Sequence, residues 1–97
     1  MDVLITYDIG GTDSREGLAR LRRLATVLER YGVRVQFSVF ECRLSPERFA
    51  RLADDVQQVI DKDRDSVIFY RFQGGFDDAR ERYGRSQAHK IGQPWIL

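Results

Sequence analysis

VRVQFSVFECRL, residues 33–44, is the stretch on which the fold of this 97-residue chain depends. Apolar and polar residues alternate from Val33 to Val39, and this period of two is typical of a strand with one buried face. Phe40 breaks the alternation because it places an aromatic ring on the polar side. Since the run is also long for one strand, we expect a sharp bend that divides it into two strands.

Helical patterns flank this stretch on both sides. The preceding segment carries apolar side chains at helical spacing, with Asp13 or Ser14 as its N-cap and Gly32 as its C-terminal stop. The following segment opens with Ser45–Pro46, an N-cap and a first-turn proline, and we expect its helix to end near Lys62. The sequence therefore predicts two helices, each with one apolar face.

Two further apolar segments predict buried strands. Val3–Tyr7 is followed by Gly10–Gly11, where adjacent glycines favour a loop. Val67–Phe72 is apolar on both sides for most of its length, as a central strand covered on two faces would be. The polar stretch over residues 77–87 predicts a loop, and residues 86–97 predict a C-terminal strand or tail that packs on the domain or on a partner subunit.

The order of these segments is β-α-β-β-α-β followed by the tail. Two-layer packing arranges this order as an α+β, ferredoxin-like fold, with an antiparallel sheet and two helices on one face. The other face of the sheet is then open, and pairing two sheets face to face is the simplest way to cover it. We therefore expect a single domain over residues 1–97 that forms a sheet-to-sheet homodimer.

Composition and charge exclude several classes of protein. No apolar run approaches the roughly 20 residues of a membrane span, so we expect a cytoplasmic protein without membrane contact. The single cysteine, Cys42, excludes an internal disulfide framework and a cysteine-based zinc site. Net charge is only +1, but residues 15–34 hold six arginines against two glutamates, and residues 54–65 are acidic. This polarity can orient a nucleic acid, and two ordinary solvated helices explain it equally well.

Asp8 is the leading candidate for chemistry because it lies where a strand meets a glycine loop. Such a position projects a carboxylate and leaves room for a phosphate or a hydrated cation. Mg²⁺ is commonly held by one or two carboxylates plus substrate phosphate, and a two-fold axis near Asp8 would supply a second carboxylate. Strand-end aspartates are more often turn formers or helix caps, and capping is the better explanation for Asp13, the nearest rival.

The remaining motifs give weaker indications. Gly10-Gly11-Thr12 lacks the lysine and spacing of a P-loop and the third glycine of a dinucleotide fingerprint. His89 is the only histidine, and nothing beside it supports a catalytic triad. Arg20 and Arg23 lie three apart on the first predicted helix, where their guanidinium groups can hold successive phosphates. A solvated helix exterior is the simpler interpretation of that spacing.

Several short segments carry a family resemblance: Tyr7-Asp8-Ile9, Leu21-Arg22-Arg23-Leu24, Tyr31-Gly32, Arg34-Val35-Gln36-Phe37-Ser38-Val39-Phe40-Glu41-Cys42, Asp65-Ser66-Val67-Ile68-Phe69-Tyr70 and Ile91-Gly92. Their order and spacing resemble the CRISPR-associated "Cas two" family of adaptation proteins over nearly the whole chain. The strand that reads Arg-Val-Gln-x-Ser-Val-Phe-Glu-Cys after Tyr-Gly is the most specific of these segments.

The resemblance implies a homodimer in which Asp8 of both subunits faces a shared cleft and binds Mg²⁺ for phosphodiester hydrolysis. It also ties four positions to that cleft or to nucleic acid: Tyr7, Arg23, Arg34 and Phe40. Together with Arg20, which is added from the helix spacing, these are the expected contacts to RNA or DNA.

The resemblance leaves the function open between two classes. In some family members the dimer is a magnesium-dependent endonuclease, acting on RNA or on DNA. In others it is a non-catalytic scaffold that holds the DNA of a new spacer while subunits of the CRISPR integrase grip its ends. We therefore expect a protein of CRISPR adaptation (spacer acquisition) in one of these two roles. A toxin-like ribonuclease of the same fold is a third interpretation.

Overall fold

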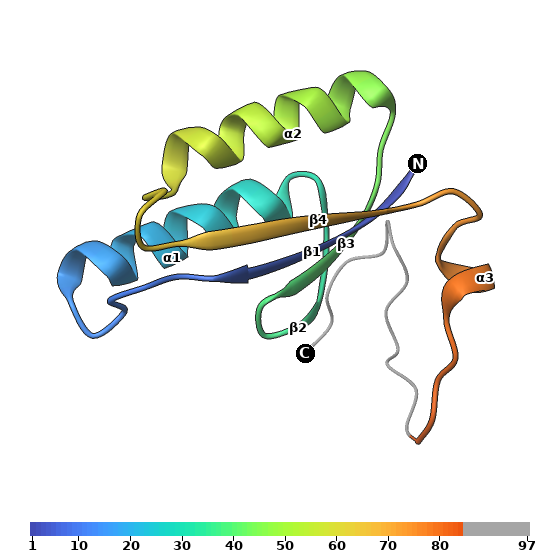
Figure 1. The fold of residues 1–97 in the computed structure, drawn as a ribbon, viewed down its shortest axis with the longest axis horizontal. Coiled ribbons are helices and arrows are strands. Elements are labelled where there is room, and N and C mark those ends of the chain that lie inside the picture. Colours follow the sequence, from blue (N-terminus) through green and yellow to red (C-terminus); the bar gives the residue numbers. More distant parts are fainter. Residues whose placement is uncertain (85–97) are drawn as a thin grey trace.

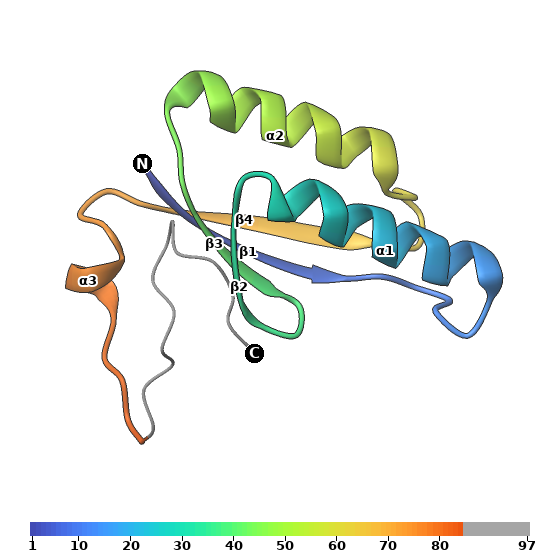
Figure 2. The same cartoon turned by 180° about the vertical axis from the view of Figure 1, so that it is seen from behind.

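A computed structural model describes residues 1–84 of the chain. Its elements follow the predicted order: β1 (Asp2–Asp8), α1 (Arg15–Glu29), β2 (Gly32–Gln36), β3 (Val39–Arg43), α2 (Pro46–Val59), β4 (Ser66–Phe72) and α3 (Phe76–Ala79). The strands form one antiparallel sheet in the order β2-β3-β1-β4. Figures 1 and 2 show α1 and α2 side by side over one face of that sheet. The predicted ferredoxin-like α+β fold is therefore confirmed.

The stretch over residues 33–44 forms two strands, as predicted, but the chain turns earlier than the sequence suggested. Phe37 and Ser38 make the turn between β2 and β3, and Phe37 is 89% exposed, so its predicted place on the buried face is wrong. The register shifts between Arg34 and Gln36, which indicates a β-bulge. Phe40 breaks the alternation because it lies on a separate strand with its own phase.

Both predicted helix starts are confirmed by their caps. The Ser14 hydroxyl accepts a hydrogen bond from the Gly17 N–H at 3.1 Å, and the Ser45 hydroxyl accepts one from the Arg48 N–H at 3.2 Å. Such caps satisfy backbone donors that have no partner within the helix. The second helix ends at Val59, slightly before the predicted Lys62. Among residues 1–84, none of these helices is both long and apolar enough to cross a membrane.

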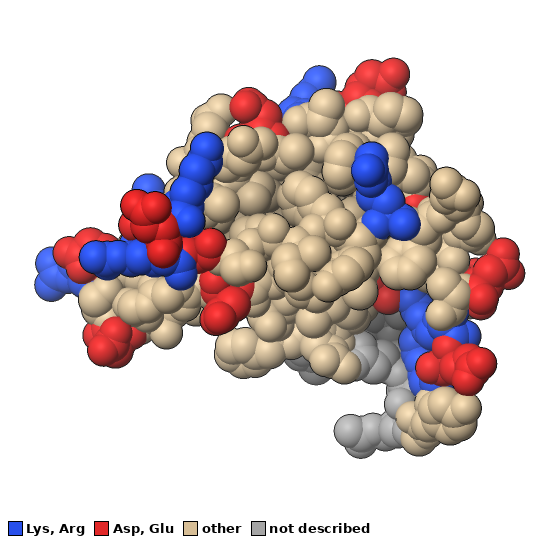
Figure 3. Space-filling view, in the orientation of Figure 1, with Lys and Arg blue, Asp and Glu red and all other residues tan. Residues whose placement is uncertain are grey.

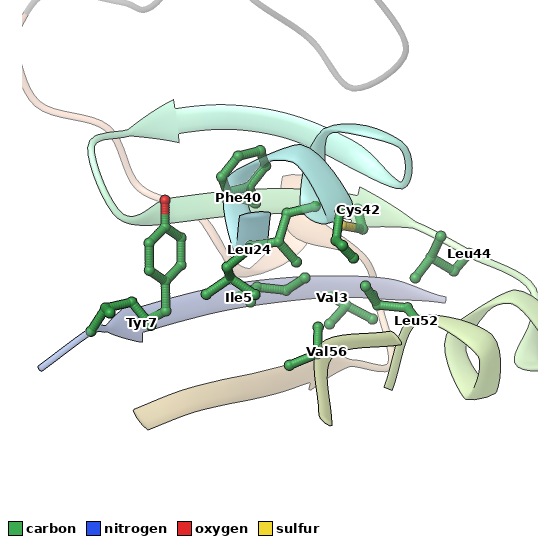
Figure 4. Close-up of a cluster of buried hydrophobic side chains, with 12 residues drawn as sticks. Val3, Ile5, Tyr7, Leu24, Phe40, Cys42, Leu44, Leu52 and Val56 are labelled. Carbon is green, nitrogen blue, oxygen red and sulfur yellow. The ribbon is translucent and has the colours of Figure 1, made fainter. Parts of the chain in front are cut away.

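The core lies between the sheet and the two long helices (Figure 4). Alternate residues of β1 and β3 enter it from the sheet, and both helices close it from above. Its fully buried side chains are Val3, Ile5, Leu24, Leu28, Phe40, Cys42 and Leu52. Because strand residues alternate between faces, the remaining residues of β1, including Asp8, point to the open face of the sheet.

In the sheet formed by residues 1–84, β4 is an edge strand and not the central strand that was predicted. Val67 and Phe69 pack against the core, but Ile68 and Tyr70 on the other side are 44% and 47% exposed. Figure 3 shows a largely uncharged surface over β4, with charged side chains gathered toward the rim. Apolar residues on both sides of a strand indicate two covered faces, and within residues 1–84 the second face is covered only near Phe72, where Phe76 packs against it.

The segment after β4 differs in part from the predicted loop, because a short helix takes up its start, whereas residues 80–84 have no helix or strand, as predicted. Phe76–Ala79 forms the short helix α3, and Phe76 is only 5% exposed. The Phe76 N–H donates to the Asp2 carboxylate at 2.9 Å, and its ring lies 5.3 Å from that of Phe72. One buried aromatic anchor gives no periodic signal, which explains the error. The strand or tail predicted for residues 86–97 lies outside the described residues.

We expect Asp2→Asn to destabilise the protein by about 1–3 kcal/mol at pH 7 and to have less effect in acid. Hydrogen bonds from Arg43, at 2.8 and 3.2 Å, hold the pKa of Asp2 below its usual value. A lowered folded pKa contributes stability that is present above the unfolded pKa of about 3.9 and is lost as pH falls through the folded value. Urea unfolding at pH 7 and pH 3 checks this, and an equal difference between the two proteins at both pH values would contradict it.

Candidate functional site

Asp8 ends β1 on the open face of the sheet, opposite the helices. It is exposed, and its neighbour across the sheet is Ser66 at the start of β4. Within residues 1–84 its carboxylate has no hydrogen-bond or ion-pair partner. An unpaired carboxylate at a fixed strand end is available for a cation, and the predicted exposure of Asp8 is confirmed.

The backbone that follows Asp8 is held from two sides. The Gly10 N–H donates to Asp65 at 3.0 Å, and the Gly10 carbonyl accepts from the Arg20 guanidinium at 3.0 Å. A Cβ on Gly10 would lie 2.6 Å from the Arg64 carbonyl oxygen, and a Cβ on Gly17 would collide with the Gly11 carbonyl. Only glycine allows these close approaches, so this is a packed loop rather than an open phosphate-binding one.

Arg20 occupies a different place from the one expected of a phosphate contact. Its side chain is 11% exposed, and its Nε donates to Asp65 at 2.9 Å in a buried ion pair. Burial raises the pKa of Asp65, but hydrogen bonds from Arg20 and from the Asp61 and Gly10 N–H groups outweigh this and lower it overall. Because Nε and one terminal nitrogen of Arg20 donate inside the protein, the structure favours a structural role for this side chain over a contact to nucleic acid.

Tyr7, Arg34 and Phe40 come together, but away from the Asp8 carboxylate. The rings of Tyr7 and Phe40 lie 6.2 Å apart, and the Arg34 guanidinium lies 5.2 Å over the Phe40 ring. Phe40 is fully buried and Tyr7 is 7% exposed, so both rings belong to the core in this chain. Arg34 is half-buried, and its Nε is enclosed without a hydrogen-bond acceptor among the described residues.

Arg23 fits the prediction for a phosphate contact better than Arg20. It is exposed on α1, as are its neighbours Arg22 and Arg30. No hydrogen bond or ion pair holds the Arg23 side chain among residues 1–84. Exposed arginines without an internal partner attract phosphate through charge.

One chain supplies a partial site for a divalent cation. The described residues contain no group of three or more histidine, cysteine or acidic side chains that would surround a metal ion. Asp8 alone fits Mg²⁺, which often keeps several waters and takes its other oxygen ligands from carboxylates and substrate phosphate. Cys42 does not serve as a metal ligand or a nucleophile, because both roles need the thiolate and burial raises the pKa of this thiol to about 12.

The role of Asp65 was missed in the sequence. It accepts hydrogen bonds from Gly10, Arg20 and Asp61 through a side chain with no exposed surface. The available signal was its place directly before an apolar strand, where a carboxylate often caps a turn. That signal does not identify the partner, because Arg20 is 45 residues away along the chain.

Comparison with known proteins gives consistent matches. The family model described as "CRISPR associated protein Cas2" matches residues 1–78. The CRISPR-associated endoribonuclease Cas2 of Nitratidesulfovibrio vulgaris is 38% identical over 97 residues, covering 100% of this chain and 94% of the relative. The CRISPR-associated endonuclease Cas2 of Halalkalibacterium halodurans is 36% identical over 97 residues, the full length of both proteins. The crystal structure of Streptococcus pyogenes Cas2 is 39% identical with a TM-score of 0.75, covering 87% of this chain and 100% of that one.

Proposed function

Because the chain belongs to the CRISPR-associated Cas2 family, we propose that it acts in CRISPR adaptation, in the cytoplasm, as a magnesium-dependent endonuclease. In this proposal a homodimer binds RNA or DNA, and Asp8 holds the metal ion and orients the attacking water. The names of its relatives include both endoribonuclease and endonuclease, which supports a nuclease. The single observation that carries the proposal is the exposed, unpaired Asp8 carboxylate at a rigidly held strand end.

Two copies of Asp8 make a better site than one. Asp8 shares the open face of the sheet with Leu4, Thr6, Ile68 and Tyr70. If two sheets pair through this face, they cover its apolar residues and bring the Asp8 carboxylates toward one interface. Mg²⁺ held there would lower the pKa of a bound water and neutralise charge on a phosphate oxygen.

We expect Arg23→Ala to weaken binding of nucleic acid to a similar extent for every sequence. Each lost phosphate contact lowers the slope of log Kd against log salt concentration by about 1. For Arg34 the proposed contact rests on the family resemblance, and a phosphate would have to approach its terminal nitrogens, because its Nε is enclosed.

The measurement is fluorescence anisotropy with labelled RNA and DNA at several salt concentrations. Arg51→Ala is the control, because Arg51 is an exposed arginine on α2. Its replacement changes the net charge of the protein by the same amount as Arg23→Ala. Equal slopes for wild type and Arg23→Ala would remove this part of α1 from the nucleic-acid interface.

The test of the proposed function is a cleavage assay with the purified protein. Labelled RNA, single-stranded DNA and duplex DNA are incubated over a range of magnesium concentrations, with a chelator as the control. We expect cleavage that requires the metal and returns when the metal is restored. Binding to nucleic acid without cleavage at any magnesium concentration would contradict the nuclease.

A second candidate function is the non-catalytic scaffold for the CRISPR integrase. It is favoured by the exposed arginines Arg22 and Arg23 of α1 and Arg30 at its C-cap, which can hold DNA by charge without any cleavage. A scaffold needs the folded dimer and its basic surface, but it does not need the Asp8 carboxylate. Integrase binding and spacer insertion that survive Asp8→Asn would support it.

A further inference from the structure

We propose that the buried Arg20–Asp65 ion pair is a positioning device for Asp8. The pair fixes the loop that follows Asp8 and the turn that leads to its neighbour across the sheet, and so sets where its carboxylate meets the metal ion and the phosphate. Neither residue touches the reacting atoms. This inference rests on the proposed function, because a carboxylate needs exact placement only if it holds a ligand.

The pair holds the loop after Asp8 through both polar groups of one residue. Arg20 donates from Nε to one carboxylate oxygen of Asp65 at 2.9 Å and from its terminal nitrogen to the Gly10 carbonyl at 3.0 Å. Asp65 accepts from the Gly10 N–H at 3.0 Å with its other oxygen. The peptide groups next to Gly10 are therefore clamped between the two charges.

Asp65 also holds Asp8 from the side of the sheet. It directly precedes Ser66, the residue that pairs with Asp8 across β1 and β4. The Asp61 N–H donates to it at 2.8 Å, which fixes the turn that leads into β4. The position of the loop after Asp8 and the position of Ser66 beside it are therefore both set by the side chain of Asp65.

The chemistry of the pair favours positioning over stability. Compared with apolar residues of the same size, a buried ion pair often adds little stability, because removing two charges from water offsets their attraction, although the loss of one partner alone is strongly destabilising. The forked guanidinium of Arg20 reaches Asp65 and the Gly10 carbonyl at the same time. A lysine ammonium is a point donor on a flexible stem and does not reproduce this geometry.

The test compares Arg20→Lys, Asp65→Asn and the double variant Arg20→Leu/Asp65→Leu with wild type. The control is Asp2→Asn, which removes a similarly buried carboxylate that is paired with Arg43 at the other end of β1. Unfolding by urea and dimer mass are measured first. Binding of Mn²⁺ by electron paramagnetic resonance, kcat and KM for cleavage, and the salt dependence of binding follow.

We expect the three variants to fold, to bind Mn²⁺ about 10- to 100-fold more weakly and to lose kcat by a similar factor. KM for nucleic acid and the salt slope should stay near the wild-type values, and Asp2→Asn should keep full Mn²⁺ affinity. If Arg20→Lys instead raises KM and lowers the salt slope, Arg20 is a phosphate contact and the inference is wrong. If the folded double variant keeps wild-type Mn²⁺ affinity and kcat, the pair serves stability alone.

The proposed function and this inference fail in different ways. A wild-type protein that neither cleaves nor binds Mn²⁺ would overturn the proposed function, and the inference would fall with it. A wild-type protein that does both, with variants that behave like Asp2→Asn, would overturn the inference alone.

Discussion

Asp8→Asn is expected to lower magnesium-dependent cleavage by at least about 100-fold, because the loss of a direct ligand should exceed the 10- to 100-fold effect of losing an outer partner. Asparagine has nearly the same shape as aspartate but carries no charge. Since Asp8 is exposed and has no partner among residues 1–84, the change breaks no internal contact. The fold, the dimer and the binding of nucleic acid should therefore be retained. Cleavage rates and Mn²⁺ affinity are the measurements.

Asp13→Asn is the matched control for this experiment. Asp13 is an exposed aspartate in the same loop, and the cap of α1 is supplied by Ser14 rather than by Asp13. We expect Asp13→Asn to cleave at the wild-type rate. An equal loss of cleavage rate in both variants would show that cleavage depends on the total negative charge of the loop and not on Asp8 as a metal ligand. Full activity in Asp8→Asn would place the chemistry elsewhere.

Most of the fold could be predicted because each element carries its own local signal. The period of two in β1, the helical spacing of the leucines and the two serine caps depend only on residues close together in sequence. Their order then restricts the two-layer topology to few choices. The prediction succeeded where local preference and global packing agree.

The errors arose where the outcome depends on distant parts of the chain or on a second molecule. Val67–Phe72 is apolar on both sides, but sequence does not reveal whether the second cover is another strand or another subunit. The chain turns at Phe37 and Ser38, and β2 carries a bulge near Val35, so a simple alternation misplaced Phe37.

The candidate site was predicted unevenly for the same reason. Asp8 could be found because a carboxylate at the junction of a strand and a glycine loop is a local pattern. Arg20 lies at the border of the apolar face of α1, where spacing does not distinguish a solvated arginine from a buried one. Its partner, Asp65, is set by the tertiary fold alone. Arg23 is exposed and Arg20 is buried in the structure, and nothing in the sequence indicated this difference.

Phe40→Ala is expected to lower the free energy of unfolding by about 3–5 kcal/mol, the range for removing a fully buried aromatic ring. The ring of Phe40 has no exposed surface, and both Tyr7 and Arg34 pack against it. Its loss leaves a cavity that the small core has little means to fill. Urea unfolding followed by circular dichroism measures the effect.

Phe37→Ala is the control, because Phe37 belongs to the same hairpin but is 89% exposed. We expect it to change stability by no more than about 0.5 kcal/mol. The pair of variants also tests the predicted contact between Phe40 and nucleic acid. If Phe40→Ala loses binding only in proportion to its unfolded fraction, the ring acts through the core. If its folded fraction binds weakly, the ring reaches the ligand. Loss of binding in Phe37→Ala would instead assign base stacking to the exposed ring at the turn.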